Sequence, residues 1–70
     1  MCNNEKIGAY IASLRKAVGL TQAGLGERLG VTGQAVSGWE RGEFLPDTGI
    51  LQDLALILDT SVDALLGGGS

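Results

Sequence analysis

Two helix starts in close succession dominate the middle of the sequence. Thr21 and Thr32 each follow an apolar residue and precede another apolar residue four positions later. A threonine in this place accepts a hydrogen bond from a free amide of the first helical turn, while the two apolar side chains pack on each other. Gly30 lies between the two units, where a left-handed helix end favours a residue without a Cβ. The pattern predicts two short helices, at 22–29 and 33–41, joined by a tight turn.

Apolar residues at helical spacing extend on both sides of this unit. Before it, such residues stand at Ile7, Ile11, Leu14 and Val18. After it, they form a broad face from Ile50 to Leu58. Spacings of this kind predict helices with one side directed at a core, and Asp47 and Ser61 are the expected N-caps of the last two helices. We therefore expect an all-α fold, a compact five-helix bundle with Trp39 in its core.

The length and the two ends set the expected domain limits. Seventy residues allow one small domain, which buries only about 60% of its unfolded surface. We expect a flexible N-terminus at 1–6, a helical domain at 7–66 and a flexible Gly/Ser tail at 67–70. No window approaches the roughly 18 consecutive apolar residues of a membrane span, and the N-terminus lacks the apolar core of a signal peptide. These features predict a cytoplasmic protein without a membrane partner.

The sequence contains few residues suited to metal binding, cofactor binding or catalysis. The sequence holds one cysteine, Cys2, and no histidine. One cysteine cannot form an internal disulfide, and zinc sites require several cysteine or histidine ligands. No pairing of a nucleophile with a base is evident, and a domain of this size has little room for a substrate pocket. We expect no metal, no cofactor and no enzymatic activity.

The charges are distributed unevenly along the chain. The formal net charge is -3 at pH 7, which argues against a generic nucleic-acid binder with a basic excess. All five basic residues precede residue 42, and five of the eight acidic residues follow it. If one face of the molecule meets a polyanion, that face must belong to the first forty-odd residues.

A family resemblance covers residues 7–66, nearly the whole chain. The stretch LTQAGLGERLGVTGQAVSGWERGEFLP, preceded by LRKAVG and followed by LQDLALILDTSVDALL, resembles the Cro and phage-repressor type (XRE-like) helix-turn-helix domains. The resemblance implies a lambda repressor-like fold in which the helix at 33–41 enters the major groove of double-stranded DNA and the helix at 22–29 lies across the backbone. The implied function is sequence-specific DNA binding by a transcriptional regulator, with repression as the expected outcome.

Position by position, the resemblance assigns roles to individual residues. The expected base contacts are Gln34, Ser37, Gly33 and Gly38. The expected phosphate contacts are Gln22, Thr32 and Arg41. Arg15 and Glu40 are the expected structural ion pair. The chemistry is compatible, because glutamine can bond to adenine N6 and N7 and the free amides of helix N-termini favour phosphate oxygens.

A homodimer is the expected assembly. One module that reads three or four base pairs discriminates poorly, and paired half-sites supply the remaining specificity. The last two helices also carry more apolar side chains, among them Leu56, Ile57 and Val62, than one face can bury.

Other interpretations of the same residues remain open. Gln34 and Ser37 are also typical of the solvated side of an amphipathic helix, and the helix dipole by itself favours an arginine such as Arg41 at a helix C-terminus. The exposed glycines and the acidic second half favour a protein-interaction or antitoxin-like module on the same fold, with weak or lost DNA binding. The small residues of the first helix, including Gly8, indicate either surface filler or a close helix partner.

Overall fold

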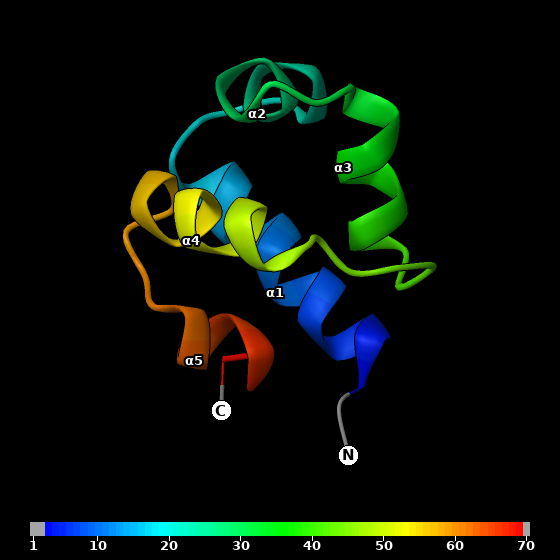
Figure 1. Cartoon of the computed structure of the whole chain (residues 1–70), viewed down its shortest axis with the longest axis vertical. Helices are drawn as coiled ribbons and strands as arrows, with labels where there is room; N and C mark the ends of the chain where they lie inside the picture. The colour runs from blue at the N-terminus through cyan, green and yellow to red at the C-terminus, as the bar shows by residue number, and fades with distance from the viewer. Residues whose placement is uncertain (1–2, 70) are drawn as a thin grey trace.

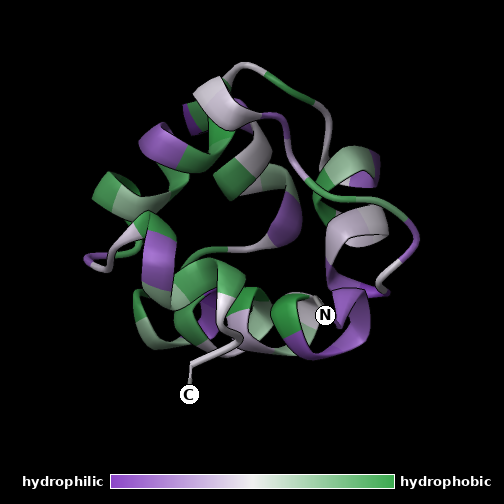
Figure 2. Cartoon of the chain, turned by 60° about the horizontal axis from the view of Figure 1, so that its bottom comes forward, coloured by the Kyte–Doolittle hydropathy of each residue, from purple (hydrophilic) through white to green (hydrophobic). Residues whose placement is uncertain are grey.

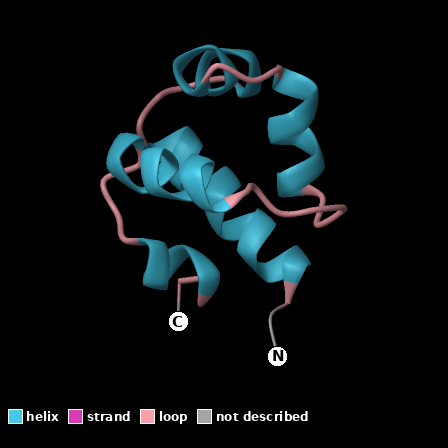
Figure 3. Cartoon of the chain, viewed as in Figure 1, coloured by secondary structure: helices cyan, strands magenta, loops and turns pink. Residues whose placement is uncertain are grey.

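Five helices make up the part of the chain that the structure describes (Figures 1 and 3). The structure, a computed structural model, describes residues 3–69. The helices are α1 (Asn4–Ala17), α2 (Gln22–Leu29), α3 (Gly33–Glu40), α4 (Thr48–Ile57) and α5 (Val62–Leu66), and this range contains no strand. No helix between residues 3 and 69 has the length and apolarity needed to cross a membrane. The predicted all-α bundle is therefore confirmed.

Each helix begins at a polar side chain that accepts a hydrogen bond from an amide of its first turn. The caps are Asn3, Thr21, Thr32, Asp47 and Ser61, with donor–acceptor distances between 2.9 and 3.1 Å. Such a cap stabilises a helix by about 1 kcal/mol. Four of these caps are predicted by the sequence, and they explain why the observed starts of the last four helices agree with its pattern.

Both ends of the described chain differ from the sequence-based expectation. Asn3 caps α1, so the helix begins at Asn4 and not at residue 7. Near the other end, Gly68 and Gly69 donate backbone hydrogen bonds of 3.0 and 3.1 Å to carbonyls of the last helical turn, and both pack against α1. Residues 67–69 are thus held by the fold and do not form a free tail. Cys2 lies outside the described residues.

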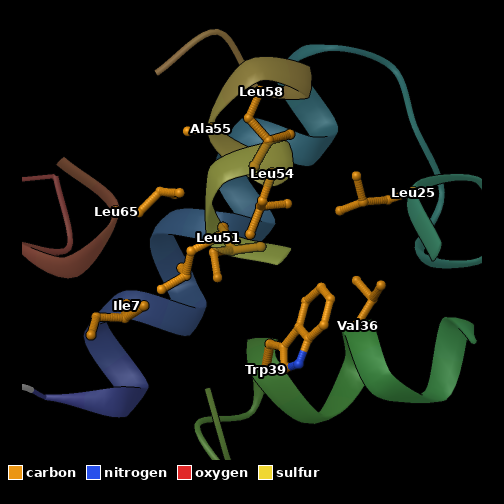
Figure 4. Packing of buried hydrophobic residues seen from close by; sticks show 10 residues of the cluster. Ile7, Leu25, Val36, Trp39, Leu51, Leu54, Ala55, Leu58 and Leu65 are labelled. Carbon is orange, nitrogen blue, oxygen red and sulfur yellow. The ribbon is translucent and has the colours of Figure 1, made fainter. Parts of the chain in front are cut away.

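The core receives side chains from all five helices. Its buried members are Ile7, Ile11, Leu25, Val36, Trp39, Leu51, Leu54, Ala55, Leu58 and Leu65. Figure 4 shows nine of these side chains, labelled, directed into the space between the helices, and Figure 2 shows apolar and polar segments mixed along the ribbon. Trp39 is a core residue as expected, whereas Val18, counted with the core face in the sequence, is 43% exposed because it lies beyond the end of α1.

The turn between α2 and α3 is tight because two glycines allow it. Gly30 adopts the left-handed conformation, with φ of 76°, that the sequence predicts at this helix end. Gly26 permits the close approach of the following chain, since a Cβ there would lie 2.8 Å from the carbonyl oxygen of Val31. These contacts fix the position of α3 relative to α2.

A third glycine brings α1 and α3 together. Gly8 is buried, and a Cβ at this position would lie 2.6 Å from the carbonyl oxygen of Glu40 at the end of α3. Of the two interpretations of the small residues in this helix, surface filler is wrong for Gly8, because it lies at a close helix contact. The contact sets the orientation of α3 on the body of the domain.

Candidate nucleic-acid interface

A buried ion pair connects α1 with the end of α3. Arg15 donates from Nε to Oε2 of Glu40 at 2.6 Å and from Nη2 to Oε1 at 3.1 Å. Its Nη1 donates to the carbonyl oxygen of Leu20 at 2.9 Å. Side-chain exposure is only 11% for Arg15 and 8% for Glu40. The structure thus contains the ion pair that the family resemblance implies.

The Glu40 carboxylate has a further partner that the sequence does not reveal. Gln22, the first residue of α2, donates from Nε2 to Oε1 of Glu40 at 2.9 Å. Burial opposes ionisation of this carboxyl, but the hydrogen bonds from Arg15 and Gln22, with the charges of Arg15 and Lys16, outweigh it and lower the pKa of Glu40. Three helices are therefore joined at one ionised carboxylate.

The hydrogen bond to Glu40 orients the Gln22 side-chain amide and uses one of its two N–H groups. A glutamine NH2 group has two hydrogens, and one remains for an outside acceptor. The start of α2 also has backbone amides without helical partners, which favour an anion. The geometry is compatible with the expected phosphate contact at Gln22, which stays a prediction.

The start of α3 presents one exposed side chain suited to reading bases. Gln34 is exposed, while the hydroxyl of Thr32 caps the helix by accepting from the amide of Ala35 at 3.1 Å. Gly33 is placed differently from the expectation. A Cβ at Gly33 would lie 3.1 Å from the Cα of Ala23, so this position faces α2 and offers no side-chain site for a base.

The position of Gly38 also differs from the expectation. Gly38 is buried, because the ring of Phe44 occupies the space into which its side chain would project. This burial disfavours the expected base contact at Gly38, which stays a prediction. In the connector after α3, Leu45 packs against the core, whereas Phe44 is 47% exposed.

Ser37 and Arg41 form a small polar network with Glu43. Arg41 donates from Nη2 to Oε1 of Glu43 at 2.9 Å and from Nε to Oε2 at 3.2 Å, and its Nη1 donates to the Ser37 hydroxyl. Both charged side chains are more than half exposed. The hydrogen bond and the positive charge of Arg41 lower the pKa of the Glu43 carboxyl. Exposed pairs of this kind add little stability, so an outside anion can replace Glu43.

The structure thus brings together some of the residues expected to contact DNA. Gln34, Ser37 and Arg41 lie along one side of α3 at spacings of three and four residues, which places them on a common face. Gly33 is half-buried beside α2 and Gly38 is buried under Phe44, a residue to which the sequence assigned no role in the site. Its only signal in the sequence is an aromatic residue shortly after a helix that carries a glycine.

Among the described residues, no group of three or more histidine, cysteine, aspartate or glutamate side chains could hold a metal ion.

Comparison with known proteins identifies the fold. A family model described as helix-turn-helix, HTH_3, matches residues 11–65, which include α2, α3 and the turn between them. This chain belongs to the HTH_3 helix-turn-helix family. The family resemblance proposed from the sequence is confirmed.

Relatives of this helix-turn-helix chain include phage and bacterial regulators. It is 39% identical over 66 residues to repressor protein C2 of Salmonella phage P22, covering 94% of this chain and 31% of the repressor. It is 40% identical over 58 residues to YazB, an uncharacterised HTH-type transcriptional regulator of Bacillus subtilis, covering 83% of this chain and 84% of YazB. The chain therefore spans about a third of the phage repressor and most of YazB.

Solved structures extend the likeness of the helix-turn-helix fold. The P22 c2 repressor in complex with a synthetic operator matches with a TM-score of 0.85 and 40% identity, over 89% of this chain and 94% of that chain. Hydroxypropylphosphonic acid epoxidase from S. wedmorenis matches with a TM-score of 0.82 and 29% identity, over 93% of this chain but 35% of the enzyme. The likeness to the epoxidase therefore concerns a part of that protein.

Proposed function

We propose that this chain binds double-stranded DNA in a sequence-specific manner as the DNA-binding part of a transcriptional regulator, with repression as its effect. The observation that carries the proposal is the outward face of α3, where Gln34, Ser37 and Arg41 lie in line on a fold that closely resembles an operator-bound repressor. In this arrangement α3 enters the major groove and α2 lies across the sugar-phosphate backbone.

Base reading falls mainly to Gln34. Its side chain is exposed in the first turn of α3, the part of a recognition helix that contacts base edges. A glutamine amide offers both a donor and an acceptor, which match N7 and N6 of adenine. Ser37 adds a hydroxyl that bonds to several base edges once Arg41 turns toward a phosphate.

Backbone contacts come from two helix starts and one arginine. Gln22 and Thr32 stand at the N-terminal ends of α2 and α3, where free amides and the helix dipole attract phosphate oxygens. Arg41 supplies the positive charge once it exchanges Glu43 for a phosphate. Because few charges are involved, we expect weak non-specific binding and a shallow salt dependence.

The absence of enzymatic activity is also part of the proposal. YazB, which this chain covers over most of its length, is described as an uncharacterised HTH-type transcriptional regulator, and the epoxidase shares only 35% of its own chain with this fold. A DNA-binding role accounts for the exposed residues of α3 without a catalytic group.

The second component of the proposal is a homodimer. Leu56 on α4 is 80% exposed, which is unusual for a leucine in a small domain, and Ile57, the next residue, and Val62, the first residue of α5, are only partly buried. A symmetric contact around Leu56 would remove this apolar surface from water. Sedimentation of the chain at hundreds of micromolar should show a dimer that Leu56→Asp abolishes, and a purely monomeric chain would contradict this component.

Selection from a randomised duplex pool at low salt tests the proposed function. We expect enrichment of a motif with two-fold symmetry, whose half-sites are centred about 10 base pairs apart. Failure to enrich any motif at protein concentrations well above micromolar would reject DNA binding. It would favour instead the protein-interaction module considered in the sequence analysis.

Substitution of Gln34 tests the assignment of the base reader. Gln34→Ala should weaken operator binding by roughly 1 to 3 kcal/mol and relax the preference at one base position in each half-site. Gln52→Ala, an exposed glutamine on α4, is the matched control and should leave binding unchanged. If both variants select the same motif as the parent chain, Gln34 is not a reader.

A further inference from the structure

We infer that Phe44 reads the 5-methyl group of a thymine in the major groove, in the place of the side chain that Gly38 lacks. The inference rests on the proposed function, because it concerns the same DNA-facing surface. It assigns a specificity role to a residue outside the recognition helix.

The contact between Phe44 and Gly38 places an aromatic ring on the recognition helix. An ideal Cβ at Gly38 would overlap the edge of the ring, and it would lie 2.5 Å from the ring carbon Cε2. Any larger residue at position 38 would therefore displace the ring. The absence of a side chain at Gly38 is what allows Phe44 to lie there.

The ring lies beside the residues proposed to read bases. Gly38 is four positions after Gln34 and directly follows Ser37, so its side of α3 borders the outward face. A side chain at position 38 would project from the helix at this border. Phe44 fills that space from the connector, and it therefore extends the recognition surface with an apolar group.

The connector holds the ring in position before any DNA binds. The amide of Gly42 donates to the carbonyl of Trp39 at 3.1 Å, and the amide of Glu43 donates to that of Gly38 at 3.0 Å. After the ring, Leu45 packs against the core and Pro46 is buried. Because both flanks are fixed, the ring loses little conformational freedom on binding.

The exposed part of the ring is available for contact with a ligand. Phe44 is 47% exposed, whereas the other two aromatic residues are buried or half-buried. An apolar group at this place matches one feature of the major groove, the methyl group of thymine, because the other base edges there present hydrogen-bond donors and acceptors. The chemistry therefore favours a thymine below the ring.

The test replaces thymines in the selected operator, one at a time, with deoxyuridine, which lacks only the methyl group. Fluorescence anisotropy then gives the affinity of each duplex. For the parent chain we expect a loss of about fourfold at one thymine in each half-site, the effect of one buried methyl group. In Phe44→Ala that thymine and uracil should bind equally well, while the effects of substitutions under Gln34 remain.

A second variant separates the reading of the methyl group from damage to the fold. Phe44→Leu keeps an apolar side chain and should retain part of the thymine preference, and circular dichroism should show the same helix content for all variants. If Phe44→Ala discriminates thymine from uracil as strongly as the parent chain does, or if the parent chain never discriminates, the inference is wrong although the proposed function stands. If the parent chain selects no operator at all, both fail.

Discussion

At the scale of single residues, we expect Glu43 to compete with DNA for Arg41, which follows the last residue of α3. Its carboxylate accepts two hydrogen bonds from Arg41, at 2.9 and 3.2 Å, and the same guanidinium donates to the Ser37 hydroxyl. Under the proposed function, a phosphate must displace this carboxylate before Arg41 contributes to binding. We therefore expect Glu43 to lower both the DNA affinity and the number of phosphates that the domain neutralises.

The substitution Glu43→Gln should raise affinity for the selected operator and also for unrelated DNA. The slope of log K against log salt should steepen by about 0.9 for the added phosphate contact. Asp53→Asn, which removes the same charge from an exposed site on α4, is the control and should change neither the affinity nor the slope appreciably. An unaltered slope in Glu43→Gln would show that Arg41 does not reach a phosphate.

At the scale of elements, the orientation of α3 depends on a glycine of α1. Gly8→Ala introduces a Cβ that would lie 2.6 Å from the carbonyl oxygen of Glu40, and the backbone must move to accommodate it. We expect a loss of about 1 to 3 kcal/mol in the free energy of unfolding. Urea unfolding, followed by helix content, measures the change.

A matched substitution in α4 should have the opposite effect. Gly49 lies in the first turn of α4, and the nearest atom to an added Cβ is 3.6 Å away, an ordinary contact. Gly49→Ala should raise the free energy of unfolding by up to about 1 kcal/mol, because alanine favours the helix. Equal effects of the two substitutions would mean that the contact at Gly8 is not tight in solution.

The elements themselves were the most predictable part of the molecule. Apolar spacing and N-cap side chains are local properties, so the sequence predicted four of the five helix starts and the core position of Trp39. The approach of two elements is not local. The contacts at Gly8 and Gly38 depend on which chain segment lies opposite each glycine, and the sequence does not contain that information.

The candidate site shows the same limit. The residue types on the outward face of α3 followed from helical periodicity and family resemblance, and Gln34, Ser37 and Arg41 lie there. The bonding partners of Gln22 and Arg41, and the ring over Gly38, depend on side-chain conformation across separate elements. Both the proposed inhibitory role of Glu43 and the proposed reading role of Phe44 therefore required the folded structure.

At the scale of the whole molecule, stability should depend on the ionisation of Glu40. The Glu40 carboxyl has a folded-state pKa below its ordinary value of 4.5, so the unfolded chain takes up a proton first as the pH falls. The stabilisation is fully present above that ordinary value, and it is lost as the pH falls through the lower folded-state pKa.

Replacement of this carboxylate tests the linkage. Glu40→Gln leaves Arg15 buried without a counter-charge and should lower the free energy of unfolding at neutral pH by roughly 3 kcal/mol. Thermal unfolding between pH 3 and 7 should show a weaker pH dependence in Glu40→Gln than in the parent chain. Glu43→Gln, which alters an exposed pair, is the control, and a parent-like acid transition in Glu40→Gln would contradict the assignment.

The packing of the last glycines on α1 has a consequence for joining domains in tandem. Gly68 and Gly69 lie against Lys6 and Tyr10, so the two ends of the described chain leave the molecule from the same side, away from α2 (Figure 1). A fused single-chain dimer therefore needs a linker that spans only the distance between neighbouring domains. For half-sites about 35 Å apart, a flexible glycine-serine linker of about 40 residues has a matching average length. Such a tether would raise the effective local concentration of the second domain without touching the helices that face DNA.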